Sequence, residues 1–348
     1  MINQIIMTTG YYDTGSSAVY VLLKEYSSCT TGIAKDRDIE HLIMYTPNGV
    51  FDLEDKLLKG NNIHRSDEAL HSFKKEMSRL NDNNFVWFGN YKKILGPDFM
   101  KSVDTLIENL TDIKLKCNWS YDYVTTRFSF KHVLGSIKNI LLGRKVIGDF
   151  SKSIVFREKD CTRYSYVTKT EFYKEAQKFV KSYCDIIRGN SDGKLIMDHF
   201  LLPNNLFRLD NYFDNMKVIV VERDPRDVFV HAVEESEQKG FQTRIPINVD
   251  DFIVFWKKLR NCVKDVSENK NIIKIQFEDL IYKYEDTVRL IEDFCGLSAD
   301  EHVKKLQCFS VEKSRKNTQM FLKYPHLSTE IKKIETELNE YIYEFPNE

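Results

Sequence analysis

The chain has 348 residues, of which 42% are hydrophobic and 30% are charged. This composition is typical of a folded globular protein with one large domain or two ordinary ones. The formal net charge of −1 gives no bulk attraction to nucleic acid, so we expect no nucleic-acid partner.

No apolar stretch is long enough to span a membrane. The N-terminal segment MINQIIMTTG lacks the basic region and long apolar core of a signal peptide, so we expect a cytoplasmic protein. The seven cysteines are scattered, with no C-x2-C pair and no Cys/His cluster of zinc-type spacing. This pattern indicates reduced thiols and predicts no metal site.

The first apolar run, Ile2–Thr8, predicts a strand that leads into a loop framed by Gly10 and Gly15. A glycine loop between a strand and a helix N-terminus can bind an oxyanion, because free backbone N–H groups and the positive end of the helix dipole point to one place. The G-x4-G spacing matches the phosphate loop of nucleotide hydrolases, but Ser16 and Ser17 replace the lysine and hydroxyl that should follow. We therefore expect anion binding without the ATPase lysine. The alternative is an ordinary strand–turn–helix connection.

Further short apolar runs predict strands, and helical patterns follow several of them. The strands are predicted at Lys145–Gly148, Lys194–His199, Lys217–Glu222 and Ile272–Phe277, and the helices at Ser16–Ser27, Arg226–Lys239, Val249–Glu268 and Tyr284–Phe294. Apolar strands that alternate with helices indicate the α/β class, here a three-layer sandwich with a central parallel sheet.

The composition shows no break that forces a second domain, so residues 1–348 are predicted to form a single domain. Residues from about 61 to 191 are predicted to add a helical elaboration on the acceptor side. Ligands in parallel sheets bind beyond the carboxyl ends of the strands, which is where the Gly10–Ser17 loop is expected.

A second anion-binding segment is predicted where the Lys217–Glu222 strand ends. Arg223 emerges at this edge, and Arg226 follows it at a helix entry. Both can form charge-assisted, bidentate bonds to a phosphate. A turn in which they form salt bridges with Asp224 and Asp227 is the alternative.

Together, these segments resemble the PAPS-dependent sulfotransferases, which carry G-x-P-[KR]-S-G-T-T in an N-terminal loop and R-x-P-[KR]-D-x-x-x-S after a later strand. Here Gly10–Ser17 read GYYDTGSS, and residues 223–231 read RDPRDVFVH. The segment Ile273–Leu297 resembles the family's strand, E-D-L turn and helix ending in F-x-G-L. Ser314–Asn317 resemble its basic C-terminal segment. Residues from about 30 to 190 contribute nothing recognisable.

The resemblance implies an enzyme that transfers a sulfuryl group from PAPS to a hydroxyl, releases PAP and uses no metal. The acceptor is expected to be a small molecule or glycan, such as a saccharide or another cell-envelope precursor. The 5′-phosphosulfate would be held by the loop residues Tyr12, Asp13, Thr14, Gly15, Ser16 and Ser17. The 3′-phosphate would be held by Arg223, His231, Arg315, Lys316 and Asn317.

Two positions depart from the family pattern. Asp13 stands where the loop has Lys or Arg, and His231 stands where a phosphate-binding serine is expected. An aspartate facing a sulfated phosphate is electrostatically unfavourable unless it points away or orients a nearby cation. Another cation must then stabilise the leaving phosphate. The candidates are Arg65, Arg127, Arg144 and Lys145.

The candidate general base is His199, which ends a predicted strand as a histidine does in cytosolic members of the family. An imidazole with a near-neutral pKa suits removal of a hydroxyl proton. Asp198 is the alternative base. If both residues lie on a strand, only one of them faces the ligand.

Two other functions are weighed against an active sulfotransferase. An ATP-dependent phosphotransferase is disfavoured, because no lysine follows Gly15 to reach the outer phosphates. A catalytically impaired protein that binds PAP or PAPS is suggested by Asp13 and His231. The oligomeric state, the acceptor and its regiochemistry stay open.

Overall fold

The computed structural model describes residues 4–34, 39–83, 89–117, 137, 141, 159–241 and 244–346. The predicted strand Lys145–Gly148 lies outside these ranges, as do the candidate cations Arg127, Arg144 and Lys145.

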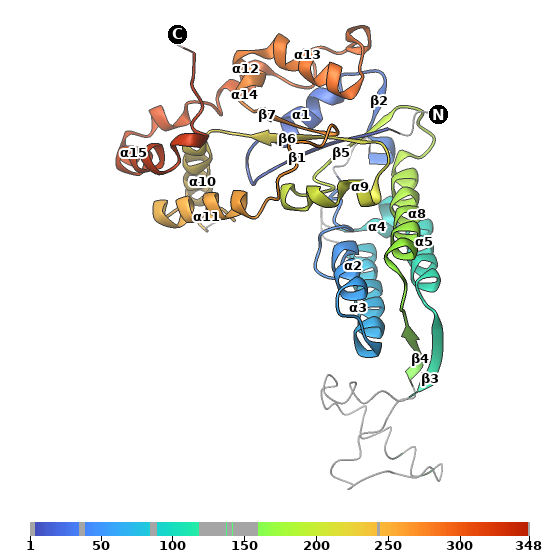
Figure 1. Cartoon of the computed structure of the whole chain (residues 1–348). Coiled ribbons are helices and arrows are strands. Elements are labelled where there is room, and N and C mark those ends of the chain that lie inside the picture. Colours follow the sequence, from blue (N-terminus) through green and yellow to red (C-terminus); the bar gives the residue numbers. More distant parts are fainter. Residues whose placement is uncertain are drawn as a thin grey trace.

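A five-stranded parallel sheet forms the centre of the molecule (Figure 1). Its strand order is β2 (Cys29–Thr30), β5 (Lys194–Asp198), β1 (Ile5–Gly10), β6 (Met216–Glu222) and β7 (Ile272–Gln276). The first strand of the chain therefore lies in the middle and pairs with two strands from much later in the sequence. The predicted α/β class with a central parallel sheet is confirmed.

Alternate residues of the central strands face opposite layers, as the pleat of a strand requires. Ile6 packs with the layer formed by α1 (Ser16–Leu23), α12 (Asp279–Tyr282) and α13 (Tyr284–Cys295). Met7 packs on the opposite side. The helices of that layer are α8 (Lys169–Arg188) and α9 (Leu209–Tyr212), together with helices of a long projection.

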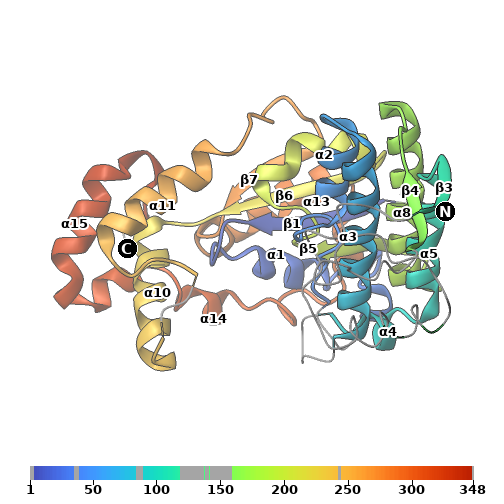
Figure 2. The same ribbon diagram turned by 90° about the horizontal axis from the view of Figure 1, so that it is seen from below.

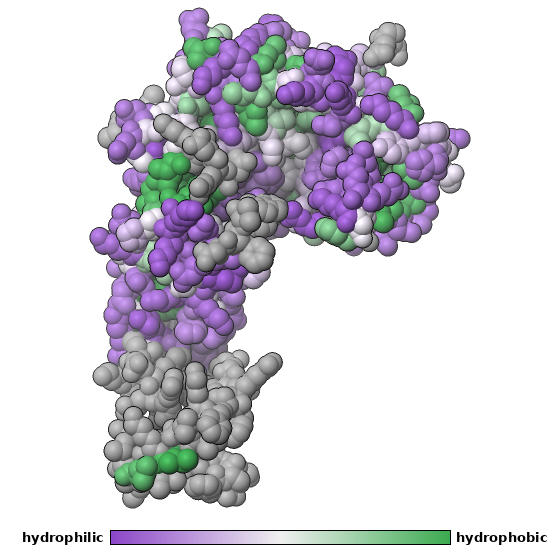
Figure 3. Space-filling model, turned by 180° about the vertical axis from the view of Figure 1, so that it is seen from behind, coloured by the Kyte–Doolittle hydropathy of each residue, from purple (hydrophilic) through white to green (hydrophobic). Residues whose placement is uncertain are grey.

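The projection extends away from the sheet (Figures 1 and 2). Besides α8, it contains α2 (Val50–Leu58), α3 (Ile63–Asp82), α4 (Tyr91–Ile94), α5 (Pro97–Asn109) and the antiparallel strands β3 (Ile113–Cys117) and β4 (Lys159–Tyr164). On the face that Figure 3 shows, the described part of the projection has a mainly hydrophilic surface. Among the described helices, none combines the length and apolar character needed to cross a membrane.

A third group of helices packs beyond β6. It consists of α10 (Pro225–Lys239), α11 (Val249–Asn261) and α15 (Ser328–Glu337). These helices form a common core that includes Phe252 and Trp256 of α11. The short helix α14 (Val311–Arg315) lies against α12. Single 3₁₀ turns occur at Gly32–Ala34, Pro203–Arg208, Ala299–Glu301, Met320–Lys323, Pro325–Leu327 and Asn339–Tyr341.

The buried carboxylate of Glu25 ties the C-terminal part of the chain to the end of α1. Glu25 is fully buried, and it accepts hydrogen bonds from the amides of Leu306 (3.0 Å), Cys308 (2.8 Å) and Phe309 (2.8 Å). The ring of His302 contacts the same carboxylate at 2.7 Å. The segment that leads into α14 is thereby fixed to the helix that begins at the glycine loop.

Candidate functional site

The loop between β1 and α1 has the geometry of an anion-binding turn. Within the described residues, the amides of Gly15, Ser16 and Ser17 donate to no acceptor. They belong to the first turn of α1, where free N–H groups and the helix dipole attract negative charge. The hydroxyl of Thr14 is buried and has no hydrogen-bond partner.

Gly15 is required by the shape of this loop. Its φ is +90°, and a Cβ there would lie 2.5 Å from the ring of Phe277. Gly10 is also enclosed, because a Cβ there would lie 2.9 Å from the carbonyl oxygen of Val221. The two glycines let the backbone approach its neighbours and leave the amides at the loop surface.

We expect Gly15→Ala to lower the free energy of unfolding by about 2–4 kcal/mol, because it combines a left-handed backbone with a clash against Phe277. Gly240→Ala is the matched control, since Gly240 also has a positive φ (+70°) but has open space around it. That variant is expected to lose only about 1 kcal/mol. Urea unfolding of both variants gives the comparison, and equal losses would show that the Phe277 contact is unimportant.

Arg223 connects the loop to the C-terminal segment. Its guanidinium donates to the carbonyl oxygens of Asp13 (2.9 Å) and Asn317 (2.7 Å). Only 5% of Arg223 is exposed, and its Nε has no partner. Burial lowers the pKa of Arg223, although the carboxylates of Asp227 and Glu278 oppose this shift.

The second arginine of this turn has a structural role. Arg226 forms a salt bridge with Asp224 at 2.7 Å and another with Glu335 at 2.9 Å, and its guanidinium stacks over the ring of Phe321. The salt-bridged turn therefore involves Arg226, while Arg223 contacts backbone carbonyls at the loop.

Arg315 and Lys316 provide exposed positive charge beside this connection. They come directly before Asn317, whose carbonyl Arg223 holds, and both side chains are exposed. Arg315 lies over the ring of Tyr282, 5.0 Å from its centroid. Neither cation forms an ion pair with a carboxylate in the part of the chain that the structure describes.

Asp198 and His199 form one hydrogen-bonded pair at the carboxyl end of β5. His199 Nδ1 lies 3.1 Å from Asp198 Oδ1, and Nε2 lies 3.2 Å from the hydroxyl of Ser16. Asp198 also accepts hydrogen bonds from Thr8 (2.7 Å) and Ser17 (3.0 Å). The pair therefore lies directly against the first turn of α1.

The condition under which only one of the two residues would face the ligand, that both lie on a strand, is not met. β5 ends at Asp198, and His199 adopts a left-handed conformation with a φ of +53°. The alternation of a strand no longer applies there, so the imidazole turns back beside the carboxylate. The two candidate bases, His199 and Asp198, are therefore in direct contact with each other.

The pair shifts the acidity of both members. Burial alone would lower the pKa of His199, but the hydrogen bond and charge of Asp198 raise it above 6.5. Burial alone would raise the pKa of Asp198, but the hydrogen bond and charge of His199, with the hydroxyls of Thr8 and Ser17, hold it below 3.8. With Nδ1–H donating to Asp198, Nε2 is the atom that can accept a proton.

The two departures from the family pattern lie beside each other. Asp13 Oδ2 is 3.7 Å from His231 Nδ1, and both side chains are about one third exposed. His231 and burial act in opposite directions on the pKa of Asp13, and the contact with His231 keeps it below 3.8. Asp13 therefore faces a side chain on α10.

Residues 150–301 match the model of the sulfotransferase family. This segment, a little under half of the chain, is thus similar to sulfotransferases. The matched segment includes β5, β6 and β7, with His199 and Arg223 at strand ends. It does not include the Gly10–Ser17 loop or the segment 315–317.

Several solved sulfotransferase structures resemble the chain at low identity. The sulfotransferase domain from the curacin biosynthetic pathway is 14% identical over 99% of both chains, with a TM-score of 0.40. The corresponding domain of the Synechococcus PCC 7002 olefin synthase is 13% identical over 99% of this chain and 96% of its own, with a TM-score of 0.39. Retinol dehydratase in complex with androsterone and inactive cofactor PAP is 13% identical over 100% and 84%, with a TM-score of 0.34. Comparison with curated proteins finds no match.

Arg65 does not neighbour Asp13. It lies in the first turn of α3, and residues on either side of it bind the β4 end of the projection: Asn61 donates to the carbonyl of Ser165, and Asp67 accepts the amide of Arg163. This end lies away from the sheet (Figure 1). Arg65 is therefore excluded as the missing cation.

Sequence reasoning missed Arg244 as a cation near the loop. Its guanidinium carbon lies 5.3 Å from the centroid of the Tyr12 ring, and its charge acts on both Asp13 and His199. Arg244 stands in the connection between α10 and α11, in a segment with no recognisable motif. A lone arginine in such a segment carries no signal that separates it from an ordinary surface residue.

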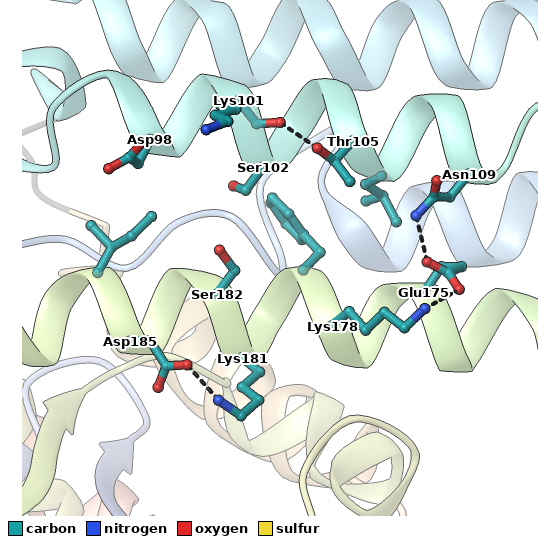
Figure 4. Close-up of a pocket in the computed structure, with 13 residues that line it drawn as sticks. Asp98, Lys101, Ser102, Thr105, Asn109, Glu175, Lys178, Lys181, Ser182 and Asp185 are labelled. Carbon is teal, nitrogen blue, oxygen red and sulfur yellow. Dashed lines mark hydrogen bonds and ion pairs between the residues drawn. The ribbon is translucent and has the colours of Figure 1, made fainter.

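A groove of about 620 Å³ lies between α5 and α8 in the projection, away from the candidate site residues (Figure 4). Its lysines are largely neutralised, because Lys178 pairs with Glu175 and Lys181 pairs with Asp185. None of the predicted site residues lines it.

Proposed function

We propose that the chain transfers a sulfuryl group from PAPS to a hydroxyl acceptor. The observation that carries this proposal is the meeting of three elements at one edge of the parallel sheet: a free-amide loop, the buried Arg223 and the Asp198–His199 pair. A nucleotide with phosphates at both ends of its ribose needs donors from separate segments, and these elements supply them.

The loop suits the 5′-phosphosulfate of the co-substrate. Its amides at Gly15, Ser16 and Ser17 are available, and the Thr14 hydroxyl lacks a partner. The enclosed Gly10 and Gly15 keep side chains out of the turn. A group of negatively charged oxygens fits this arrangement better than a neutral ligand, because the helix dipole adds to the amide donors.

The 3′-phosphate is assigned to the neighbouring basic residues. Arg223 is held in place by the carbonyls of Asp13 and Asn317, while Arg315 and Lys316 are exposed next to it. Arg223 thus supports the loop as well as contributing charge. His231 lies 3.7 Å from Asp13 of the loop, so its contribution is assigned to the loop side rather than to the 3′-phosphate.

The proposed chemistry places the acceptor hydroxyl at His199 Nε2, where Ser16 now contacts the ring. The hydroxyl oxygen attacks the sulfur, the bond from sulfur to the 5′-phosphate oxygen breaks, and that oxygen keeps the electron pair. His199 accepts the proton, and Asp198 stabilises the resulting imidazolium. PAPS supplies a sulfuryl group attached to a phosphate leaving group.

Thermal unfolding in the presence of nucleotides tests the ligand class. PAP should raise the midpoint by a few degrees, because saturation at about 100 times Kd adds about 2.7 kcal/mol to the native state. Mg-ATP should have a smaller effect. Stabilisation by Mg-ATP but not by PAP would contradict the proposal.

The basic segment gives this experiment a matched control. The double variant Arg315→Ala/Lys316→Ala should lose more of the PAP shift than of the 5′-AMP shift, because only PAP carries a 3′-phosphate. Lys313→Ala removes a similar exposed charge from the same helix, α14, and should change neither shift.

A PAP-binding protein without catalysis is the second candidate, favoured by Asp13 at the position of a family cation. It predicts stabilisation by PAP with no transfer from radiolabelled PAPS to a broad panel of hydroxyl compounds, saccharides included. Transfer to any member of the panel would exclude it.

A further inference from the structure

Three potential metal ligands meet at the mouth of the loop. A carboxylate oxygen of Asp13, a ring nitrogen of His231 and a carboxylate oxygen of Glu235 all lie within 4.8 Å of one another. His231 and Glu235 are one helical turn apart on α10, so they project from the same face of that helix. Asp13 reaches them from the loop.

The positions of these side chains are constrained by the fold. Asp13 has a left-handed φ of +59°, and Arg223 holds its carbonyl oxygen. The Nδ1 atom of His231 is buried and makes no hydrogen bond, since its 3.7 Å distance from Asp13 exceeds hydrogen-bond length. Glu235 is partly buried and pairs with Lys239. An unsatisfied ring nitrogen between two carboxylates is typical of a cation site rather than of a packed core.

We propose that Asp13, His231 and Glu235 bind one divalent cation, such as Mn²⁺ or Zn²⁺, and that this ion supplies the positive charge that the loop lacks. One imidazole and two carboxylates suit both metals. Donor atoms on one ion are about 3–4 Å apart, so small side-chain rotations are enough to close the present arrangement. The remaining coordination positions face an anion that binds at the loop.

Electrostatics favours this arrangement over the three residues alone. Two carboxylates at the edge of an anion site repel a phosphosulfate, whereas a divalent ion between them reverses the local charge. Cations also approach this cluster from its surroundings: Arg244 acts on Asp13, and Lys239 pairs with Glu235. Neither Lys239 nor Arg244 pairs with all three side chains of the cluster. The space between Asp13, His231 and Glu235 is therefore available to an ion.

Titration with Mn²⁺ followed by electron paramagnetic resonance tests the site without nucleotide. Free Mn²⁺ gives a strong signal that falls on binding, and exposed thiols do not compete for it as they do for Zn²⁺. We expect one saturable site per chain. Asp13→Asn and Glu235→Gln should each weaken it by at least about tenfold.

The chosen substitutions preserve the local structure. Asparagine tolerates the left-handed backbone of residue 13, so Asp13→Asn removes charge without adding strain. Glu237→Gln is the matched control, because Glu237 is an exposed carboxylate on the same helix and outside the cluster. It should bind Mn²⁺ like the native protein. Absence of saturable binding, or equal binding in all three variants, would overturn the cation site.

The role of the ion at the loop rests on the proposed function and has its own measurement. PAP affinity, measured by calorimetry with EDTA and with saturating Mn²⁺, should rise about fivefold or more with the metal. By linkage, PAP should tighten Mn²⁺ binding by the same factor. Unchanged PAP affinity alongside saturable Mn²⁺ binding would overturn the charge-supplying role. Intact Mn²⁺ binding with no PAP binding in either condition would instead overturn the proposed function.

Discussion

Replacement of His199 by asparagine is expected to slow sulfuryl transfer by about 10²–10⁴-fold and to leave PAP affinity unchanged. The variant removes the proton acceptor at Nε2 but keeps a residue that tolerates the observed φ of +53°. The measurement is the rate of label transfer from PAPS, with PAP affinity determined in parallel. Unchanged turnover would exclude His199 as the base.

The pH dependence of the transfer rate shows whether His199 acts as a base or has only a structural role. Turnover should fall as the pH decreases through the pKa of His199, which Asp198 holds above 6.5, because the protonated ring cannot accept another proton. In Asp198→Asn the charge that raises this pKa is lost and burial remains, so the midpoint should move to lower pH. A midpoint that stays in place would show that the pair does not control the proton transfer.

Arg223→Ala is expected to weaken PAP binding by roughly 10–100-fold and 5′-AMP binding by much less. A hydrogen bond to a charged group contributes about 1.5–3 kcal/mol, and only PAP presents a 3′-phosphate to this guanidinium. Titration calorimetry with both nucleotides gives the ratio of the two losses. Equal losses would mean that Arg223 acts only by holding the carbonyls of Asp13 and Asn317.

Arg226→Ala provides the comparison for that experiment. Arg226 is nearly as buried as Arg223 and lies in the same turn, but its guanidinium is neutralised by Asp224 and Glu335. We expect this variant to be less stable, with the ratio of PAP to 5′-AMP affinity unchanged. A change in the ratio of PAP to 5′-AMP affinity would show that Arg226 also contributes to binding of the 3′-phosphate, contrary to the role proposed for Arg223 alone.

The sheet was predictable because its strands are short apolar runs. The strands predicted at Lys194–His199 and Lys217–Glu222 are observed with shifts of one residue. The helix predicted at Val249–Glu268 ends instead at Asn261. Its Phe252 and Trp256 pack in the core shared with α10 and α15, whereas Val263 packs against the other core cluster. β2 has two residues and no apolar pattern, so no local signal marks it.

The segments that form the candidate site were predictable one by one, but the side-chain contacts within the site were not. Glycine spacing identified the loop, and a strand-end arginine identified Arg223. The contact between Asp13 and His231 joins residues from β1–α1 and α10, and no pattern within either segment encodes their distance. The Asp198–His199 pair depends on one backbone dihedral angle, which tertiary packing decides.

The position of β1 has a consequence for synthesis of the chain. Its neighbours β5 and β6 lie near residues 194–222, and the buried Glu25 that follows α1 needs amides from residues 306–309. At roughly 5–20 residues per second, a ribosome releases these partners tens of seconds after β1 itself. The Gly10–Ser17 loop is therefore synthesised early and receives its last contacts late. The apolar strand beside it needs protection on the nascent chain until nearly the whole polypeptide has emerged.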